Sequence, residues 1–520
     1  MFLDGDDGMT ELAPCLMVQG TGSGVGKSVL TAALCRLFAR AGYRVAPFKS
    51  QNMSLNASVT ADGGEIGRAQ AAQAEAAGVE PSVDMNPILL KPEAGDRSQV
   101  VVRGRAVGTV DWREYGRMHP RLLPIVAESL ERLRRAHDLV LIEGAGSPAE
   151  INLTATEIVN MRVARLADAR VLLVGDIDRG GVFGALVGTL TLLEPADRAR
   201  VGGFVVNKFR GDAEVLRPGL EELTARTGVP VLGVVPWIDG QLAPAEDSLD
   251  LDSPRAPAGG GDAALEIAVV RLPHVANFDD VEPLAEEPGV RVRWVTTPDA
   301  LGSADLVLLP GSKSTVADLD WLRARGLAAA IRDAAAAGRQ VLGICGGFQM
   351  LGEAVLDPEG VESPAPSREG LRLLPVVTTF SPSKTTVRVR ARVARAPGPF
   401  DAAAGSEVTA YEIHAGQTRV APDAPRLFAV LERAGAPTVD ADGVASASGN
   451  VAGTYLHGLF ANDALRGALL RHLAAHAGRA PDPRWGASRG DPYERLARVV
   501  GAALDLQAVA RLAGLAVPRA

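Results

Sequence analysis

The first residues whose types and spacing suggest chemistry form a glycine-rich turn, QGTGSGVGKS, at positions 19–28. A short apolar run precedes the turn as a predicted strand, and a helical pattern from Val29 to Ala41 follows it. This order is typical of a phosphate-binding loop, in which glycine N–H groups and the helix N-terminus surround phosphate oxygens. Lys27 is expected to reach the terminal phosphates, and the Ser28 hydroxyl to bind Mg²⁺. The predicted ATP-binding residues of the turn are Gly20, Thr21, Gly22, Gly24, Gly26, Lys27 and Ser28.

Polar residues at two other predicted strand ends extend this site. Glu143 ends the buried strand at 138–143, and a glycine turn follows it. A carboxylate there can hold Mg²⁺ directly or through water, whereas the alternative is an acid that caps a turn. Asn207 follows the predicted strand from Val201 to Val206 and is a candidate for nucleobase contact. ATP and Mg²⁺ are therefore the expected cofactors, with Ser28 and Glu143 as metal ligands. The alternative for the whole region is an ordinary glycine turn between strand and helix.

A second chemical centre lies in VLGICGGFQMLG, residues 341–352, where a strand, a sharp turn and a helix surround Cys345. This is the order of a nucleophile elbow, with cysteine in the place of serine. The N–H of Gly346 is predicted to stabilise an oxyanion, and Gly311 is the expected source of a second N–H. A buried structural cysteine is the alternative.

A cysteine nucleophile needs a base from elsewhere in the fold. His457 is the candidate, because it follows a predicted strand and begins a loop in GTYLHGLF. His274 and His414 remain alternatives. Single histidines are usually structural, so the assignment depends on the elbow.

A polar, amide-rich stretch, KSQNMSLNAS at 49–58, follows the second predicted strand. It shows neither helical nor strand periodicity and is expected to be a loop. Loops at the carboxyl ends of strands are where α/β proteins bind ligands, although Asn and Gln also occur in turns for backbone reasons. The predicted substrate-binding residues are Gln51, Asn52, Ser54 and Asn56.

Composition limits the possible function classes. The chain has 520 residues, 47% of them hydrophobic, and a net charge of −8, which argues against general nucleic-acid binding. Its three cysteines have no metal-binding spacing, and we find no signal peptide or apolar run long enough to cross a membrane. We therefore expect a cytoplasmic protein with small-molecule partners, no nucleic-acid partner and no membrane partner. Lysine is scarce beside arginine, which suggests that the remaining lysines lie where a compact ammonium group is needed.

Strands that alternate with helices predict an α/β fold with two α/β domains, the first built on a parallel sheet with helices on both faces. Residues 14–250 are assigned to a phosphate-loop domain and residues 251–262, rich in Pro, Gly and Ala, to a linker. Residues 263–475 are assigned to a second α/β domain, which carries the cysteine elbow, and residues 476–520 to a helical tail.

Taken together, these motifs resemble the cobyric acid synthases, which are glutamine-dependent amidotransferases of corrinoid (vitamin B12) biosynthesis. The resemblance extends over roughly residues 16–475. The phosphate loop, whose first glycine is shifted as in dethiobiotin synthetase, and the cysteine elbow occur in many families. KSQNMSLNA together with YEIHAG is more specific.

The resemblance implies that residues 263–475 form a domain like the class I glutamine amidotransferases, in which Cys345 and His457 release ammonia from glutamine. It further implies that residues 14–250 form an ATP-dependent synthetase domain that activates carboxylates with MgATP. Four peripheral carboxylates of adenosylcobyrinic acid a,c-diamide would then become amides. The glutamate that usually follows the catalytic histidine by two residues is Leu459 here, so the group that orients His457 is not identified. The alternatives are an amidotransferase for another polycarboxylate, such as the earlier corrin, and a phosphate-loop regulatory ATPase with an inactive second domain.

Overall fold

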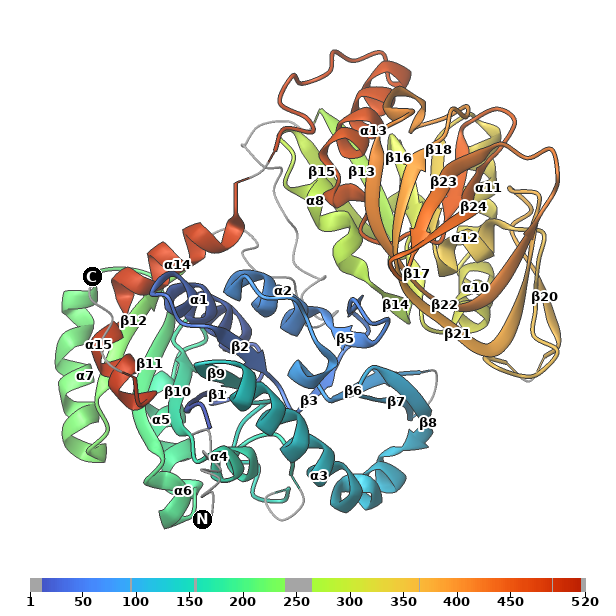
Figure 1. Cartoon of the computed structure of the whole chain (residues 1–520). Helices are drawn as coiled ribbons and strands as arrows, with labels where there is room; N and C mark the ends of the chain where they lie inside the picture. The colour runs from blue at the N-terminus through green and yellow to red at the C-terminus, as the bar shows by residue number, and fades with distance from the viewer. Residues whose placement is uncertain are drawn as a thin grey trace, which may run out of the picture.

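The computed structural model describes residues 12–93, 96–153, 157–238, 264–363, 365–488 and 490–515. The chain forms two α/β units that lie side by side (Figure 1), so the predicted fold class is confirmed. We call residues 12–238 with the two last helices the N-terminal unit, and residues 264–488 the C-terminal unit. The predicted linker at 251–262 lies outside the described residues. Within the described ranges, no helix is both long and apolar enough to cross a bilayer.

The N-terminal unit is built on a six-stranded parallel sheet in the order β12-β11-β10-β1-β9-β2. Alternate residues of its central strand β1 enter different cores, with Leu16 and Val18 on one face and Cys15 and Met17 on the other. Helices therefore cover both faces, as βαβ crossovers require. The strands are β1 (Cys15–Gly20), β2 (Val45–Phe48), β9 (Leu139–Glu143), β10 (Arg170–Asp176), β11 (Val201–Phe209) and β12 (Val231–Pro236). The helices are α1 (Lys27–Arg40), α2 (Arg68–Ala77), α3 (Trp112–Ala136), α4 (Met161–Ala167), α5 (Val182–Leu192), α6 (Pro195–Arg198) and α7 (Ala213–Thr227).

An insertion after β2 corrects one prediction. Residues 49–58 are not a loop without strands, because they contain β3 (Gln51–Met53) and β4 (Ala57–Val59). The partner of β3 is β6, more than 30 residues later, so the short local pattern does not reveal the pairing. The order of the resulting sheet is β3-β6-β7-β8, while β4 pairs with β5. The remaining elements are β5 (Glu65–Gly67), η1 (Val83–Met85), β6 (Ile88–Pro92), β7 (Arg97–Val102) and β8 (Arg105–Asp111).

The C-terminal unit has a mixed sheet whose parallel part runs β15-β13-β16-β18-β25. These strands are β13 (Leu265–Val270), β15 (Val290–Val295), β16 (Leu306–Leu309), β18 (Gln340–Ile344) and β25 (Val451–Thr454). The sheet continues through strands that the sequence did not lead us to expect: β19 (Ala354–Leu356), β20 (Ser367–Glu369), β21 (Val376–Val393), β22 (Glu407–Val420), β23 (Arg426–Arg433) and β24 (Ala436–Ala445). A separate pair joins β14 (Val275–Ala276) to β17 (Gly311–Ser312). The helical segments are η3 (Phe278–Val281), α8 (Glu282–Ala285), α9 (Pro298–Leu301), α10 (Thr315–Ala324), α11 (Leu327–Ala336), α12 (Gly346–Leu351), η4 (Asp401–Ala403), η5 (Leu459–Ala461) and α13 (Asp463–His476).

The chain returns to the N-terminal unit at its C-terminal end. Helices α14 (Pro492–Ala503) and α15 (Leu506–Leu512) lie beside α1 and β12 (Figure 1). Leu496 and Val500 are fully buried in the same core as Leu16. The helices of the predicted tail therefore complete the first core, although the domain division itself stays a prediction.

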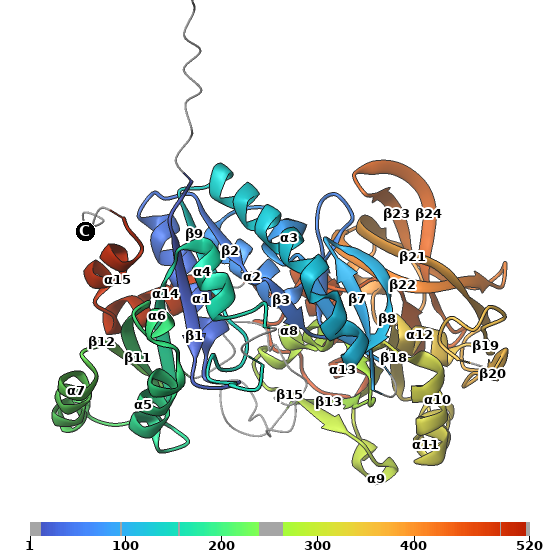
Figure 2. The same ribbon diagram turned by 90° about the horizontal axis from the view of Figure 1, so that it is seen from below.

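The two units meet along the inserted strands (Figure 2). Strand β4 packs against β21 and β22, and Val59 shares a small apolar cluster with Ile413. Ion pairs surround this contact. Lys384 Nζ lies 2.6 Å from Glu65 Oε2, and Lys313 Nζ lies 2.6 Å from Glu93 Oε1. The inserted strands of the N-terminal unit thus contribute Lys91 and Gln99 to the wall of a polar cavity that the C-terminal unit also lines.

Leu496→Ala should destabilise the N-terminal unit, because it removes a fully buried side chain of α14. Truncations of this kind cost about 2–5 kcal/mol. At roughly 2–4 °C per kcal/mol, the thermal midpoint should fall by about 4–20 °C. The matched control is Arg495→Ala at the exposed neighbouring position, which should shift the midpoint little. Equal midpoints for the two variants in calorimetry would show that α14 does not belong to this core.

Candidate active site

The predicted phosphate loop connects β1 to α1 as expected from the sequence. Gly26 has φ 99°, and a Cβ added there would lie 2.1 Å from Asn207 Nδ2, so only glycine fits without a rearrangement. Asn207 Nδ2 donates to Val25 O at 2.8 Å. The Lys27 ammonium bridges the loop, with Nζ 2.9 Å from Gly22 O and 3.1 Å from Gly146 O. The structure therefore brings Lys27 and Asn207 to the same turn from separate parts of the sequence.

Glu143 is fully buried at the centre of a polar cluster beside this turn. Its Oε1 accepts from Ser28 Oγ at 2.8 Å and lies 2.9 Å from Lys49 Nζ, while its Oε2 accepts from Gln73 Nε2 at 2.5 Å. Protein Mg²⁺ sites commonly use one or two carboxylates together with phosphates and water. The adjacent hydroxyl and carboxylate fit that donor set, and the described residues contain no group of three or more His, Cys, Asp or Glu side chains suited to a metal.

The predicted substrate-binding residues are bonded within the protein. Gln51 Oε1 accepts from Tyr115 Oη at 2.5 Å, and Asn52 Nδ2 donates to Gln70 Oε1 at 3.1 Å. Ser54 Oγ accepts from the N–H of Asn56 at 3.0 Å. Asn52, Ser54 and Asn56 are all buried. These contacts organise the inserted segment, and contact with a substrate stays a prediction.

Cys345 occupies the sharp turn between β18 and α12. Its φ of 52° is unusual for a residue with a side chain, which is the strain expected of a nucleophile elbow. A Cβ on Gly346 would lie 2.7 Å from Ser312 N, so the Gly311–Ser312 strand runs directly beside the N-terminus of α12. The two predicted oxyanion-hole glycines, Gly311 and Gly346, therefore lie on adjacent segments.

His457 follows β25 and faces an acid that the sequence analysis did not identify. His457 Nδ1 lies 2.7 Å from Asp280 Oδ2, and the N–H of Gly458 donates to Asp280 Oδ1 at 2.7 Å. The ring also stacks on Tyr411, with centroids 5.3 Å apart. Burial opposes protonation of His457, but the Asp280 carboxylate and then Cys345 outweigh it and raise the pKa of His457 to about 10. Asp280 thus stands in for the glutamate that Leu459 replaces, and the imidazolium is favoured beside the thiol.

The alternative histidines are engaged elsewhere. His274 Nδ1 lies 2.7 Å from Asp318 Oδ1. His414 lines the same cavity as Cys345, but its Nδ1 bonds Gly416 O at 2.8 Å and its ring stacks on Tyr455. His457 combines proximity to Cys345 with an orienting acid, so the geometry favours it as the base.

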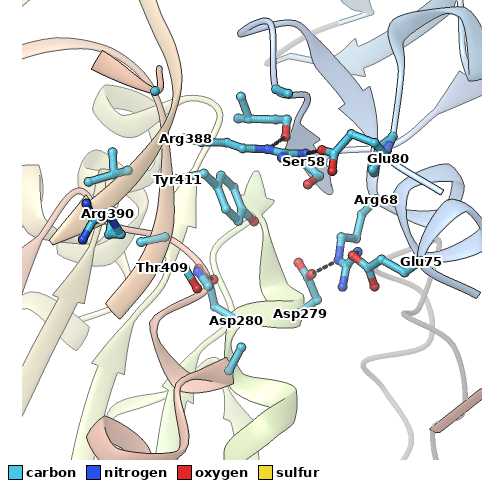
Figure 3. Close-up of a pocket in the computed structure, with 18 of the residues that line it drawn as sticks. Ser58, Arg68, Glu75, Glu80, Asp279, Asp280, Arg388, Arg390, Thr409 and Tyr411 are labelled. Carbon is cyan, nitrogen blue, oxygen red and sulfur yellow. Dashed lines mark hydrogen bonds and ion pairs between the residues drawn. The ribbon is translucent and has the colours of Figure 1, made fainter. Parts of the chain in front are cut away.

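The segment that carries Asp280 is held by the N-terminal unit. Asn56 Oδ1 accepts from the N–H of Phe278 at 2.9 Å, and Asn277 Nδ2 donates to Ala57 O at 2.9 Å. Arg68 Nε lies 3.0 Å from Asp279 Oδ2 across the boundary (Figure 3). Arg68 and Asp279 line a cavity of about 750 Å³ between the units, and Asp280 and Tyr411 also lie in its wall.

One sequence signal could have identified Asp280. Asp279 and Asp280 follow β13 in the chain, and Cys345 follows β18 in the same parallel sheet. Polar groups after parallel strands gather at one edge. The signal is weak because β14 and the turns around it separate these acids from the end of β13.

Comparisons with known proteins agree with this arrangement. A model described as CobQ/CobB/MinD/ParA nucleotide binding domain matches residues 16–249, and one described as CobB/CobQ-like glutamine amidotransferase domain matches residues 266–465. The chain is 56% identical to the cobyric acid synthase of Sorangium cellulosum, over 96% of this chain and 98% of that protein. The chain belongs to the cobyric acid synthase family. Cobyric acid synthases of Pelotomaculum thermopropionicum and Dehalococcoides mccartyi are 50% and 48% identical, each over 98% of the relative's length. Membership of the cobyric acid synthase family confirms the resemblance found in the sequence and the nucleotide-binding character of the N-terminal unit.

Asp280→Asn should slow alkylation of Cys345 by iodoacetamide at pH 7.5 by about tenfold or more. Without the carboxylate, burial lowers the pKa of His457 and removes the imidazolium that accompanies a reactive thiolate. Cys15 and Cys35 are buried, and burial raises the pKa of both thiols, so the label reports Cys345.

Asp279→Asn is the matched control for this substitution, because it removes the neighbouring charge and leaves Asp280 on His457. It should retain most of the alkylation rate. An unchanged rate in Asp280→Asn, measured by mass spectrometry of the labelled peptide, would exclude Asp280 as the group that activates the pair.

Proposed function

We propose that this chain uses ATP and glutamine to amidate four peripheral carboxylates of adenosylcobyrinic acid a,c-diamide. The observation that carries the proposal is identity of 48–56% to cobyric acid synthases over nearly the full length of both chains. A nucleotide-binding match and a glutamine amidotransferase match in one chain fit a reaction with two centres. The ordered Cys345–His457–Asp280 arrangement argues against a regulatory ATPase with an inactive second domain.

In the proposed glutaminase step, Cys345 Sγ attacks the amide carbon of glutamine. The N–H groups of Gly346 and of the Gly311–Ser312 segment donate hydrogen bonds to the oxyanion that forms. His457 gives its proton to the departing nitrogen. Ammonia then leaves, and the acyl group remains on Cys345 as a thioester. His457, held by Asp280, then takes a proton from water, which attacks the thioester and releases glutamate.

In the proposed synthetase step, a corrinoid carboxylate attacks the terminal phosphorus of ATP, and ADP leaves. Ammonia then attacks the acyl phosphate carbon, and phosphate leaves as the amide forms. Lys27 is placed to stabilise the phosphoryl charge, with the phosphate-loop glycines around it and Asn207 on the nucleobase. Ser28 and Glu143 would hold Mg²⁺, which supplies positive charge against the phosphates. Gln51, Asn52, Ser54 and Asn56 are proposed to serve the corrinoid site.

Incubation of the protein with the a,c-diamide, ATP and glutamine should give four successive replacements of a carboxyl OH by NH₂. Mass spectrometry of the corrinoid follows each replacement. The unamidated acid, offered in parallel, is the control substrate and should react poorly. A single replacement, or turnover only on the unamidated acid, would assign the chain to a different corrinoid amidotransferase.

Cys345→Ala should abolish glutamine-dependent amidation, with a loss of about 10⁴-fold or more, yet leave ammonia-dependent amidation largely intact. Free ammonia bypasses the thioester, whereas both nitrogen sources need the acyl phosphate. Lys27→Ala should therefore abolish both activities. Amide formation is measured with glutamine and then with ammonium at high pH.

Cys35→Ala is the control, because it removes a buried thiol of α1 and should retain both activities. If folded Cys345→Ala loses the ammonia reaction as well, the division into two centres is wrong. If it loses neither activity, Cys345 is structural.

A further inference from the structure

The cavity beside Cys345 has a charge distribution that the proposed chemistry does not explain. It measures about 230 Å³, and its lining includes Lys91, Lys313, Lys384, Glu93 and Glu362. Pockets for drug-sized ligands typically span roughly 300–1,000 Å³. The cavity therefore suits a molecule as small as an amino acid and excludes a corrinoid.

Each lysine of this cavity already bonds a carboxylate. Lys91 and Lys384 lie 2.5 Å and 2.6 Å from the two oxygens of buried Glu65, and Lys313 lies 2.6 Å from Glu93 Oε1. Glu362 has no ion pair with any described side chain. It is the lining carboxylate whose charge no bonded lysine or arginine compensates.

Glu362 is held in place by its loop. Asp357 accepts from the N–H groups of Val361, Glu362 and Ser363 at 2.7–2.8 Å, which fixes the turn. Glu362 Oε2 lies 3.4 Å from the N–H of Val316 in the first turn of α10. Burial, only partly offset by the more distant Lys313 and by this backbone contact, raises the pKa of Glu362 to about 8. A positively charged ligand group would supply the missing compensation.

A chain of contacts links this carboxylate to the nucleophile. Thr315 precedes Val316, and its Oγ1 donates to Gln349 Oε1 at 3.0 Å. Gln349 lies one helical turn after Cys345, and its N–H donates to Cys345 O at 3.0 Å. Glutamine carries its reactive amide at one end and an α-ammonium group at the other, so a ligand with its amide at Cys345 needs an anionic group farther along the same cavity.

We infer that Glu362 is a specificity-determining residue that binds the α-ammonium group of glutamine. The inference rests on the proposed glutaminase function and adds the reason why a free amino acid, and not any primary amide, is the nitrogen source. A charged hydrogen bond of this kind is worth roughly 1.5–3 kcal/mol, or about 10- to 150-fold in binding.

The test compares glutamine with 4-carbamoylbutanoate, which has the same amide and carboxylate but lacks the α-amino group. Glu362→Gln should raise KM for glutamine about 10- to 100-fold with little change in kcat. Its KM for 4-carbamoylbutanoate should equal that of the unaltered protein, because the lost contact involves only the missing group. Ammonia-dependent amidation should be unchanged, which also reports that the variant is folded.

Glu359→Gln is the matched control, since it removes a carboxylate from the same loop at an exposed position outside the cavity lining. It should behave as the unaltered protein does with both amides. An unchanged KM for glutamine in Glu362→Gln, or an equal rise for both amides, would overturn the inference. Absence of glutamine hydrolysis in the unaltered protein would instead overturn the proposed function.

Discussion

The ion pair between Asp280 and His457 is the contact on which the second centre depends. Asp280 Oδ2 accepts from His457 Nδ1, which leaves Nε2 as the ring atom available to the thiol. The acid is fixed in turn by the N–H of Gly458, so His457 and Gly458, in the loop after β25, and Asp280, in η3, hold one another. A buried carboxylate and imidazole are expensive to desolvate separately, and the pairing offsets that cost. Leu459, at the position where a glutamate might have served, is buried in the apolar core instead.

This acid belongs structurally to both units. The C-terminal unit supplies Asp280, but Asn56 and Arg68 of the N-terminal unit hold the residues on its N-terminal side. Arg68 begins α2, and Gln73 on the same helix donates to Glu143 beside the phosphate loop. Five residues of α-helix span about 7.5 Å. One short helix therefore contacts both the segment that carries Asp280 and the buried carboxylate beside the phosphate loop. The arrangement of His457 and Asp280 is therefore a property of the assembled pair of units.

The sequence correctly predicted those local structures that contiguous residues determine. The phosphate loop and the cysteine elbow each consist of a strand, a glycine turn and a helix in unbroken order, so spacing alone indicates their shape. Asp280 is 177 residues from His457, and no local pattern joins them. Strand β3 is only three residues long and depends on β6, and β21 pairs with β23, which lies beyond β22 in the chain. The N-terminal role of α14 and α15 was missed for the same reason, because the apolar face of α14 does not reveal which sheet it covers.

The scarcity of lysine, in contrast, proved informative about position. All six lysines lie among the described residues, none is exposed, and each has a bonded oxygen partner. Lys27, Lys49 and Lys208 surround the phosphate loop, and the other three stand where the units meet beside the thiol. Arginine would present a broad, planar group that is poorly suited to a single buried oxygen, whereas an ammonium group is compact. Glu65 shows the effect: burial opposes its ionisation, but Lys384 and Lys91 outweigh burial and lower its pKa to about 2. The carboxylate therefore remains charged wherever the enzyme works, and one lysine from each unit is held to it. Lysine is therefore confined to two places, the phosphate loop and the boundary between the units beside Cys345.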